Sequence, residues 1–239
     1  MGDEVELEGL IQEAHRHLEE LRGYLRTRKA PSSASDWPDL DEAHPSGTLE
    51  LRLLGGALVT VGGFKLELRP RFVELLCVLA LHPEGLTGEQ LALAVWGEDS
   101  DPAVVKTELC RLRNWVPLDS RPYRLGVEIK ADFLQVLMCL REGDLAGALQ
   151  LYRGPLLPRS EAPEVLETRI LLEESLRRAV LRSGNSDLIW HLAERLNSDL
   201  EVWEAAHRAL PETDNRRPLA QTQVTLLKSR WQGDLSRAV

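Results

Sequence analysis

The stretch AVVKTELCRLRNWV, residues 103–116, decides how the rest of the chain is interpreted. Its apolar residues recur at steps of four, three and four, which predicts a helix over 103–116 with one buried stripe. The stripe consists of Val105, Leu109, Leu112 and Val116. Short polar and basic groups on the opposite face suit the major groove of DNA. They are Thr107, Cys110, Arg111 and Asn114, with Lys106 and Arg113 on the flank. An ordinary amphipathic helix with a solvated basic face has the same spacing.

The residues that follow this helix favour the DNA-binding interpretation. Pro117 ends the predicted helix, and residues 121–130, RPYRLGVEIK, predict two short strands about Gly126. A helix followed by an arginine-bearing hairpin is the order of a winged helix, here with a wing over residues 120–130. Residues 103–125 hold five Lys/Arg and two acids, in a chain of net charge −9. DNA contact must therefore come from this local patch, and we expect it to be strongly salt-dependent.

The composition is typical of a soluble globular protein of one large or two small domains. The chain has 239 residues, of which 43% are hydrophobic and 28% charged. Its three cysteines are widely spaced and form no Cys-x-x-Cys pair, so neither a disulfide framework nor a zinc site is indicated. The longest apolar run, Leu75 to Leu81, is too short to span a membrane. The N-terminus is acidic and does not resemble a signal peptide, so we expect a cytoplasmic protein without membrane association.

Residues 1–29 predict a heptad helix. Its apolar residues are Leu7, Ile11, Ala14, Leu18, Leu21 and Leu25, in an a/d register. Such a helix would either form a homodimer through residues 7–25 or dock against the body of its own chain, and the spacing leaves both open. Residues 30–47 are rich in Pro, Ser and acids, which predicts a linker.

Residues 48–69 alternate apolar and polar side chains between Gly55-Gly56 and Gly62-Gly63. This pattern predicts three short antiparallel strands with glycine turns. Pro70 then opens a predicted helix through about Leu81, and Glu89 to Trp96 form another. With the helix at 103–116, the predicted order is three strands, three helices and a hairpin.

This order and its motifs resemble the OmpR/PhoB-type winged helix, which implies a DNA-binding domain over residues 48–130. The matching pieces are LRLLGGALVTVGGFKLELRPRFVELLCVLALHPEGLTGEQLALAVWG, ELCRLRNWV and PYRL. Trp96 stands where that family ends its second helix. Arg111-Leu112-Arg113 stands for the RLR of the recognition helix, and Tyr123-Arg124-Leu125 for the end of the GYRL wing strand.

Residues 131–239 predict helices throughout, at about 132–140, 143–152, 162–182, 186–197, 200–209 and 218–234. Small residues recur among large ones, as paired helices need for close packing; they include Ala146, Ala148, Ala193, Ala205 and Ala206. The phrase GDLAGALQLYRGPLLP, residues 143–158, resembles the bacterial transcriptional activator domain, a tetratricopeptide-like array. That domain follows the winged helix in SARP-type activators, and the whole resemblance covers about 49–210. The expected fold class is α+β, mostly α: a winged helix with an N-terminal antiparallel sheet, then a tetratricopeptide-like helical array.

The resemblance implies double-stranded DNA as the partner. In that family the recognition helix enters the major groove and the wing touches the neighbouring minor groove. Carried over by motif, Arg111 would contact a base edge, while Arg113 and Lys106 would contact phosphates. Further contacts from the same face and from the wing would come from Thr107, Cys110, Asn114, Arg121 and Arg124.

The loop before the recognition helix can contact RNA polymerase in the family. Glu98 and Asp99 make this loop acidic here, and we expect them to form a polymerase contact. The chain also departs from the family pattern. Ala103, Glu108 and Cys110 stand where relatives often have polar or basic residues. The wing lacks the glycine before tyrosine, and Pro122 would stiffen that strand and remove a donor.

The main alternative is a protein-interaction module in which the winged helix has lost DNA affinity and the helical array binds a partner. The net charge of −9 and the departures above favour this alternative. We do not expect an enzyme, a cofactor or a metal site. The segment Gly143 to Gly147 lacks the Lys-Ser/Thr of a phosphate loop, and no Gly-x-Ser-x-Gly or His-Glu-x-x-His occurs.

Overall fold

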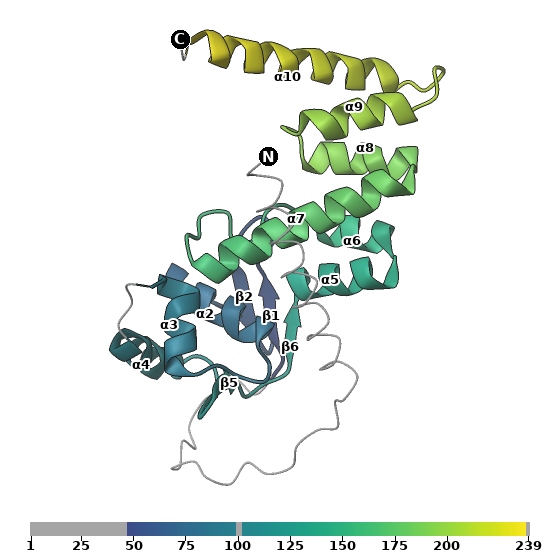
Figure 1. Cartoon of the computed structure of the whole chain (residues 1–239). Coiled ribbons are helices and arrows are strands. Elements are labelled where there is room, and N and C mark those ends of the chain that lie inside the picture. Colours follow the sequence, from purple (N-terminus) through teal and green to yellow (C-terminus); the bar gives the residue numbers. More distant parts are fainter. Residues whose placement is uncertain (1–46, 99–101, 238–239) are drawn as a thin grey trace. The chain divides into compact units, whose positions relative to one another are not determined.

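The computed structural model describes residues 47–98 and 102–237, with the backbone alone for Pro102 and for residues 231–237. Within these residues the chain is mostly helical, with one four-stranded sheet and one two-stranded hairpin (Figure 1). The predicted heptad helix over 1–29, nearly all of the predicted linker over 30–47 and the loop residue Asp99 lie outside the described residues. The homodimer contact through residues 7–25 therefore stays a prediction.

The sheet confirms the three predicted strands and adds a fourth. Its strands are β1 (Leu49–Arg52), β2 (Leu58–Val61), β3 (Phe64–Leu66) and β6 (Ile129–Ala131), in the order β3-β2-β1-β6. Leu49 and Leu51 are fully buried while the side chains between them are not, as the alternation predicts. The three predicted strands pair antiparallel, as expected, and β6 adds a parallel pairing at the edge of β1 that β2 leaves open.

Three helices follow the first three strands along the chain, as predicted. They are α2 (Pro70–Leu81), α3 (Gly88–Trp96) and α4 (Pro102–Leu112). Residues 72–81 of α2 are all buried, so α2 forms the centre of this part of the core. Helix α3 begins with a capping box: the Gln90 N–H donates to the Thr87 hydroxyl, and the Thr87 N–H donates to the Gln90 side chain.

Helix α4 is shorter than the predicted 103–116, because it begins at Pro102 and ends at Leu112. After Leu112 the Asn114 and Trp115 N–H groups donate to carbonyls three residues earlier, at 3.3 and 2.9 Å, and the chain tightens into turns. The Val116 N–H still donates to the Leu112 carbonyl at 3.1 Å. Val116 consequently stays buried with the other three residues of the stripe, although it lies beyond the helix.

The predicted hairpin about Gly126 is wrong in its turn and its partners. The hairpin pairs β4 (Leu118–Ser120) with β5 (Tyr123–Leu125), and its turn is Arg121-Pro122. Pro122 therefore lies in the turn rather than in a strand. In the turn, its missing N–H removes no hydrogen-bond donor from the pairing of β4 with β5. The strand after Gly126 is β6, which joins the four-stranded sheet because β1 offers it an unpaired edge.

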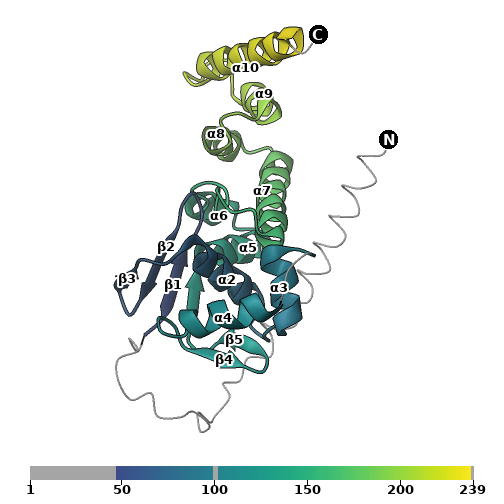
Figure 2. The ribbon, with the colours of Figure 1, turned by 90° about the vertical axis from the view of Figure 1, so that its left-hand side faces the viewer.

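The rest of the described chain consists of helices, and the predicted segments are confirmed to within about two residues at most ends. They are α5 (Asp132–Glu142), α6 (Leu145–Leu151), α7 (Pro163–Ser183), α8 (Ser186–Arg195), α9 (Leu200–Ala209) and α10 (Arg217–Arg237). Each helix packs against the next (Figures 1 and 2). The predicted boundary at 130/131 falls within β6. The division into domains and the tetratricopeptide-like type of the array stay predictions.

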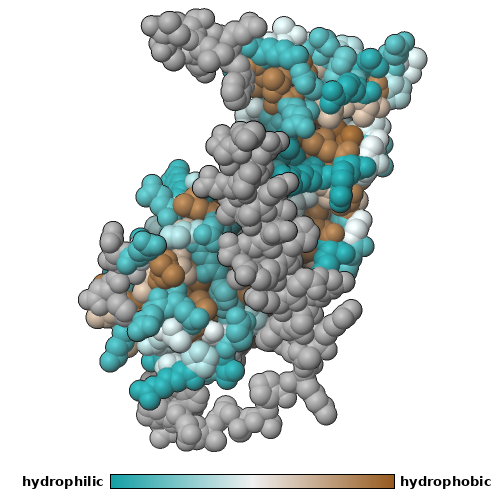
Figure 3. Space-filling model, viewed as in Figure 1, coloured by the Kyte–Doolittle hydropathy of each residue, from teal (hydrophilic) through white to brown (hydrophobic). Residues whose placement is uncertain are grey.

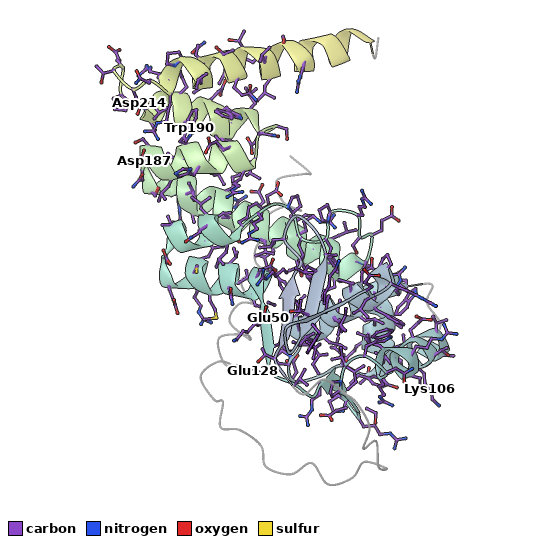
Figure 4. All side chains as sticks on the ribbon, turned by 180° about the vertical axis from the view of Figure 1, so that it is seen from behind. Glu50, Lys106, Glu128, Asp187, Trp190 and Asp214 are labelled. Carbon is purple, nitrogen blue, oxygen red and sulfur yellow. The ribbon has the colours of Figure 1, made fainter. Side chains whose placement is uncertain are left out.

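Small residues and one aromatic pair hold α8 against α9. Ala193 and Ala206 are fully buried, as the spacing of small residues predicts. Trp190 and Trp203 meet edge to face, with ring centroids 5.5 Å apart. The Arg216 side chain lies over Trp190 and forms ion pairs of 2.7 Å with both Asp187 and Asp214 (Figure 4). This cluster ties the segment before α10 to α8.

The end of β1 is the joint between the sheet and the helical array. The N–H groups of Leu53 and Leu54 donate to the two carboxylate oxygens of Asp132, the first residue of α5, each at 3.0 Å. The segment 153–158 then pairs with the same stretch: the Leu157 N–H donates to Leu53 O, and the Gly55 N–H donates to Pro155 O, both at 2.9 Å. The Asp132 side chain and the segment 153–158 thus orient α5, α6 and α7 against β1.

We predict that Asp132→Ala destabilises the protein by about 1–3 kcal/mol for each backbone N–H that it leaves unsatisfied, because Leu53 and Leu54 are buried. Urea unfolding followed by circular dichroism measures the change. Asp132→Asn keeps one acceptor oxygen and should lose less. Equal stability of the wild type and Asp132→Ala would show that water replaces the carboxylate.

A second contact between the two parts of this joint contains a titratable residue, His82. His82, just after α2, contacts Glu164 on α7 through Nε2 and Glu84 through Nδ1, the latter at 3.1 Å. Burial alone would lower the pKa of His82. The hydrogen bonds and charges of Glu164 and Glu84 outweigh burial, and the pKa of His82 lies above its ordinary value of 6.5. The charged imidazolium is therefore the form that the folded state favours.

We predict that the contribution of His82 to stability depends on pH. Because its pKa is higher in the folded than in the unfolded state, this contribution is complete below about pH 6.5 and is lost as the pH rises through the folded-state pKa. The difference in free energy of unfolding between wild type and His82→Gln, measured from about pH 5 to about pH 9, should shrink over that window. A difference independent of pH would contradict the assignment.

Candidate nucleic-acid interface

The outer face of α4 presents the polar groups that the sequence predicts. The stripe Val105, Leu109, Leu112 and Val116 is at most 1% exposed. On the other side of the helix, the exposed residues are Lys106, Thr107, Cys110 and Arg111, followed by Asn114 in the turn. Figure 4 shows Lys106 at the outer side of α4. The predicted arrangement of this face is confirmed, whereas the DNA contacts of its residues stay predictions.

Arg111, predicted to contact a base edge, forms an ion pair on this face. Its Nη1 donates to Oε1 of Glu108 at 2.9 Å, one turn earlier on α4. The Arg111 side chain is 56% exposed, so this is a surface pair rather than an internal one. Pairs of this spacing stabilise a helix by only about 0.2–0.5 kcal/mol. Arg111 can therefore leave Glu108 for a stronger acceptor at little cost.

Arg113 does not face outward with Arg111. It lies in the turn after α4, half-buried, with Nε and Nη2 both closed off from water and without a hydrogen-bond partner. The sequence placed it on the flank of the helix, and its N–H still donates to the Leu109 carbonyl at 3.0 Å, so it stays four residues beyond a buried position of the stripe. Arg113 points toward the hairpin, where it lines a cavity with Ser120 and Arg121.

The β4–β5 hairpin lies beside α4 and carries the remaining predicted arginines (Figure 2). Arg121 is exposed in the turn, and Arg124 is exposed on β5. Nε of Arg124 donates to Oδ2 of Asp119 on the opposite strand at 2.5 Å. Both predicted wing arginines are thus on the surface, and Asp119 already neutralises one of them.

The hairpin is attached to the loop before α3. The Leu86 N–H donates to Tyr123 O at 2.9 Å, and the Tyr123 N–H donates to Leu86 O at 2.8 Å. Gly85 makes this approach possible: its φ is +92°, and a Cβ there would lie 2.7 Å from Cγ of Pro122. These contacts set the position of Arg121 relative to α4.

Two hollows meet between these elements. A cavity of about 190 Å³ lies between α4 and the hairpin, lined by Lys106, Leu109, Cys110, Arg113, Ser120, Arg121 and Tyr123. An open groove of about 550 Å³ shares Lys106 and Tyr123 with it and extends to the start of α3 at Thr87, Gly88 and Glu89. Figure 3 shows that the surface around α4 and the hairpin is mostly hydrophilic. Residues 103–125, which contain most of α4 and the hairpin, carry five basic and two acidic side chains.

The fold brings into this site two polar residues that no sequence pattern had assigned to it. Ser120 and Tyr123 line the cavity because β4 pairs with β5, and no sequence pattern identified β4. Of the predicted polymerase-contact residues, Glu98 is exposed after α3, and Asp99 is outside the described residues. The departures Ala103 and Cys110 are both on the exposed face of α4.

Within the described residues, no helix is both long and apolar enough to cross a membrane. The same residues contain no group of three or more His, Cys, Asp or Glu side chains arranged to hold a metal ion.

Comparison with known proteins finds a sequence relative of which this chain covers only part. No family model matches the chain. An uncharacterized 47.3 kDa protein in the thcA 5′ region of Rhodococcus erythropolis is 32% identical over 216 residues, which cover 87% of this chain and 46% of that protein. The chain thus spans about half the length of this relative.

Among solved structures, EmbR of Mycobacterium tuberculosis in complex with a low-affinity phosphopeptide matches with a TM-score of 0.42 and 17% identity, over 79% of this chain and 60% of that one. A TM-score of this size supports no conclusion about fold or function.

We predict that Gly85→Ala displaces the hairpin and destabilises the protein by more than the roughly 1–2 kcal/mol that a left-handed backbone costs an L-residue. The added Cβ would meet Pro122 as well as adopt a positive φ. Gly143→Ala is the matched control, because Gly143 has φ +80° with nothing within 4 Å of an added Cβ. Urea unfolding of both variants separates steric overlap from backbone strain. Equal losses would mean that the hairpin moves aside freely.

Proposed function

We propose that this protein is a sequence-specific, double-stranded-DNA-binding transcriptional regulator, an activator of the SARP type with an OmpR/PhoB-type winged helix. Helix α4 would read the major groove, and the β4–β5 hairpin would contact the adjacent minor groove. The tetratricopeptide-like interpretation of α5–α10 belongs to the same proposal, since it rests on the motif at 143–158.

The observation that carries this proposal is the one-sided burial of α4. Four apolar residues anchor the helix in the core, and the face that remains presents Lys106, Thr107, Cys110 and Arg111 without any described element covering it. An α-helix exposed along one polar side has the dimensions that the major groove admits. Arg121 extends the basic surface beyond the helix, toward the neighbouring part of a duplex.

The net charge of the chain determines how DNA affinity should divide between non-specific attraction and specific contacts. The chain carries net −9, so non-specific attraction to DNA is weak and the local basic cluster must provide the phosphate contacts. Each phosphate neutralised contributes about 0.9 to the slope of log affinity against log salt. Arginine can bond guanine O6 and N7 together, worth about 1–3 kcal/mol of discrimination. We propose Arg111 for that contact.

The finer parts of the proposal concern partners and location. Glu98, exposed after α3, supports an acidic contact with RNA polymerase. A homodimer through residues 7–25, a cytoplasmic location and the lack of enzymatic activity rest on sequence patterns alone.

A protein-interaction module is the second candidate. Glu108 and Asp119 each pair with an arginine of the presumed DNA-binding surface, at 2.9 and 2.5 Å. Leu166 and Ile170 are exposed one turn apart on α7, where a partner could bind. Retention of the purified protein on heparin at low salt favours the DNA-binding function, and passage without retention favours the interaction module.

We predict that Arg111→Ala weakens binding to a DNA site selected from a random pool by about 1–3 kcal/mol, or roughly 5- to 150-fold. Glu108→Gln should strengthen it, because the amide no longer competes for Arg111 or repels phosphate. Fluorescence anisotropy measures both.

In Arg111→Ala the Glu108 carboxylate loses its partner and can repel DNA. The double variant Arg111→Ala/Glu108→Gln also removes that carboxylate, so it measures the loss of the Arg111 contact alone. Arg182→Ala, an exposed arginine on α7, is the matched control and should bind as wild type does. Equal affinity of wild type and Arg111→Ala for every selected sequence would refute base recognition by α4.

A further inference from the structure

We infer that the cavity between α4 and the β4–β5 hairpin is a seat for one phosphate-class oxyanion, held by Arg113 together with Lys106 and Arg121. The inference rests on the proposed function in one respect: a backbone phosphate of bound DNA is the first source of that anion. Free inorganic phosphate offers the same chemistry, and the experiments below distinguish the two.

The unpartnered guanidinium of Arg113 is the main observation. Nε and Nη2 form the edge of the guanidinium that donates two parallel N–H···O bonds to an oxyanion. Both nitrogens are out of contact with water, and no protein group accepts from either. A buried donor without an acceptor is destabilising, and more so when it is charged. An anion entering the adjacent cavity would supply both missing bonds.

Arg113 can reach such an anion at little cost. Because no hydrogen bond holds its Nε edge in place, turning the guanidinium into the cavity that it already lines breaks no bond at that edge. Lys106, Arg121 and Ser120 line the same cavity, so an ammonium, a second guanidinium and a hydroxyl are donors available to an anion there. Three elements of the chain thus bring donors to one point.

The cavity carries no opposing charge. Its lining residues include three cations and no acid. The two acids nearest in sequence, Glu108 and Asp119, are ion-paired with Arg111 and Arg124, which are not lining residues. A cation is excluded by the three positive side chains, and a neutral ligand would leave Arg113 uncompensated. The composition of the cavity therefore selects an anion.

The size of the cavity suits a single tetrahedral oxyanion. The cavity of about 190 Å³ has room for one phosphate and a few bridging waters. The cavity shares Lys106 and Tyr123 with the larger open groove beside it, so a phosphate that remains part of a longer strand can also enter.

The first experiment titrates the full-length protein with inorganic phosphate, against chloride at matched ionic strength, and follows the arginine Nε–H signals by NMR. We expect a saturable shift of the Arg113 signal that is absent for Arg182. In Arg121→Gln, which changes only an exposed side chain, phosphate affinity should fall several-fold. Arg113→Lys keeps the charge but not the paired donors, and should bind roughly tenfold more weakly.

The second experiment uses a selected duplex in which single phosphates are replaced by neutral methylphosphonates. With wild-type protein, one position should weaken binding markedly. With Arg113→Gln, the same substitution should have little further effect, and the salt slope should fall by about 0.9. Because Arg111 remains intact in this variant, sequence preference should not change.

The outcomes separate the two proposals. A saturable phosphate shift together with Arg113-dependent coupling at one DNA position establishes the seat and its source. A saturable shift in a protein that binds no DNA establishes a free-phosphate site and removes the DNA-binding function. Tight DNA binding without a phosphate shift and without coupling at any position overturns the seat and leaves the DNA-binding function standing.

Discussion

The burial of one side of α4 is the constraint on which the candidate interface depends. Val105, Leu109 and Leu112 attach the helix to the core, and their spacing leaves no freedom about which side faces water. Rotation of the helix by half a turn would expose this stripe and bury Lys106 and Arg111, at a cost of several kcal/mol of lost apolar burial. The exposed basic face is therefore a consequence of core packing, whatever it binds.

Backbone hydrogen bonds and one carboxylate add to apolar packing in positioning the elements around α4. The hairpin is held by two hydrogen bonds between Leu86 and Tyr123, which require a glycine at position 85. The helical array is oriented by Asp132, which receives the N–H groups at the end of β1. Such contacts are directional, so they set the angle between elements as well as holding them together.

Charge on the candidate interface is positive overall, but part of it is paired. Arg111 and Arg124 each have an acidic neighbour, whereas Arg113 has none, and two of its guanidinium nitrogens are buried. An exposed ion pair exchanges partners at low cost, but a buried unpaired guanidinium gains much from any anion. The two kinds of arginine would consequently respond differently to a ligand. Arg111 would discriminate between binding partners, and Arg113 would bind an anion.

Local spacing in the sequence determined most elements and one face of the site. Glycine pairs and alternation identified β1, β2 and β3, and the steps of three and four residues identified the stripe of α4, because these periodicities are properties of a single segment. Only the tertiary structure decided where α4 ends, that β4 pairs with β5, and that β6 joins β1. The strand pairings depend on which edges distant residues leave open. They bring Ser120 and Tyr123 beside Arg113, so the cavity exists only in the folded chain.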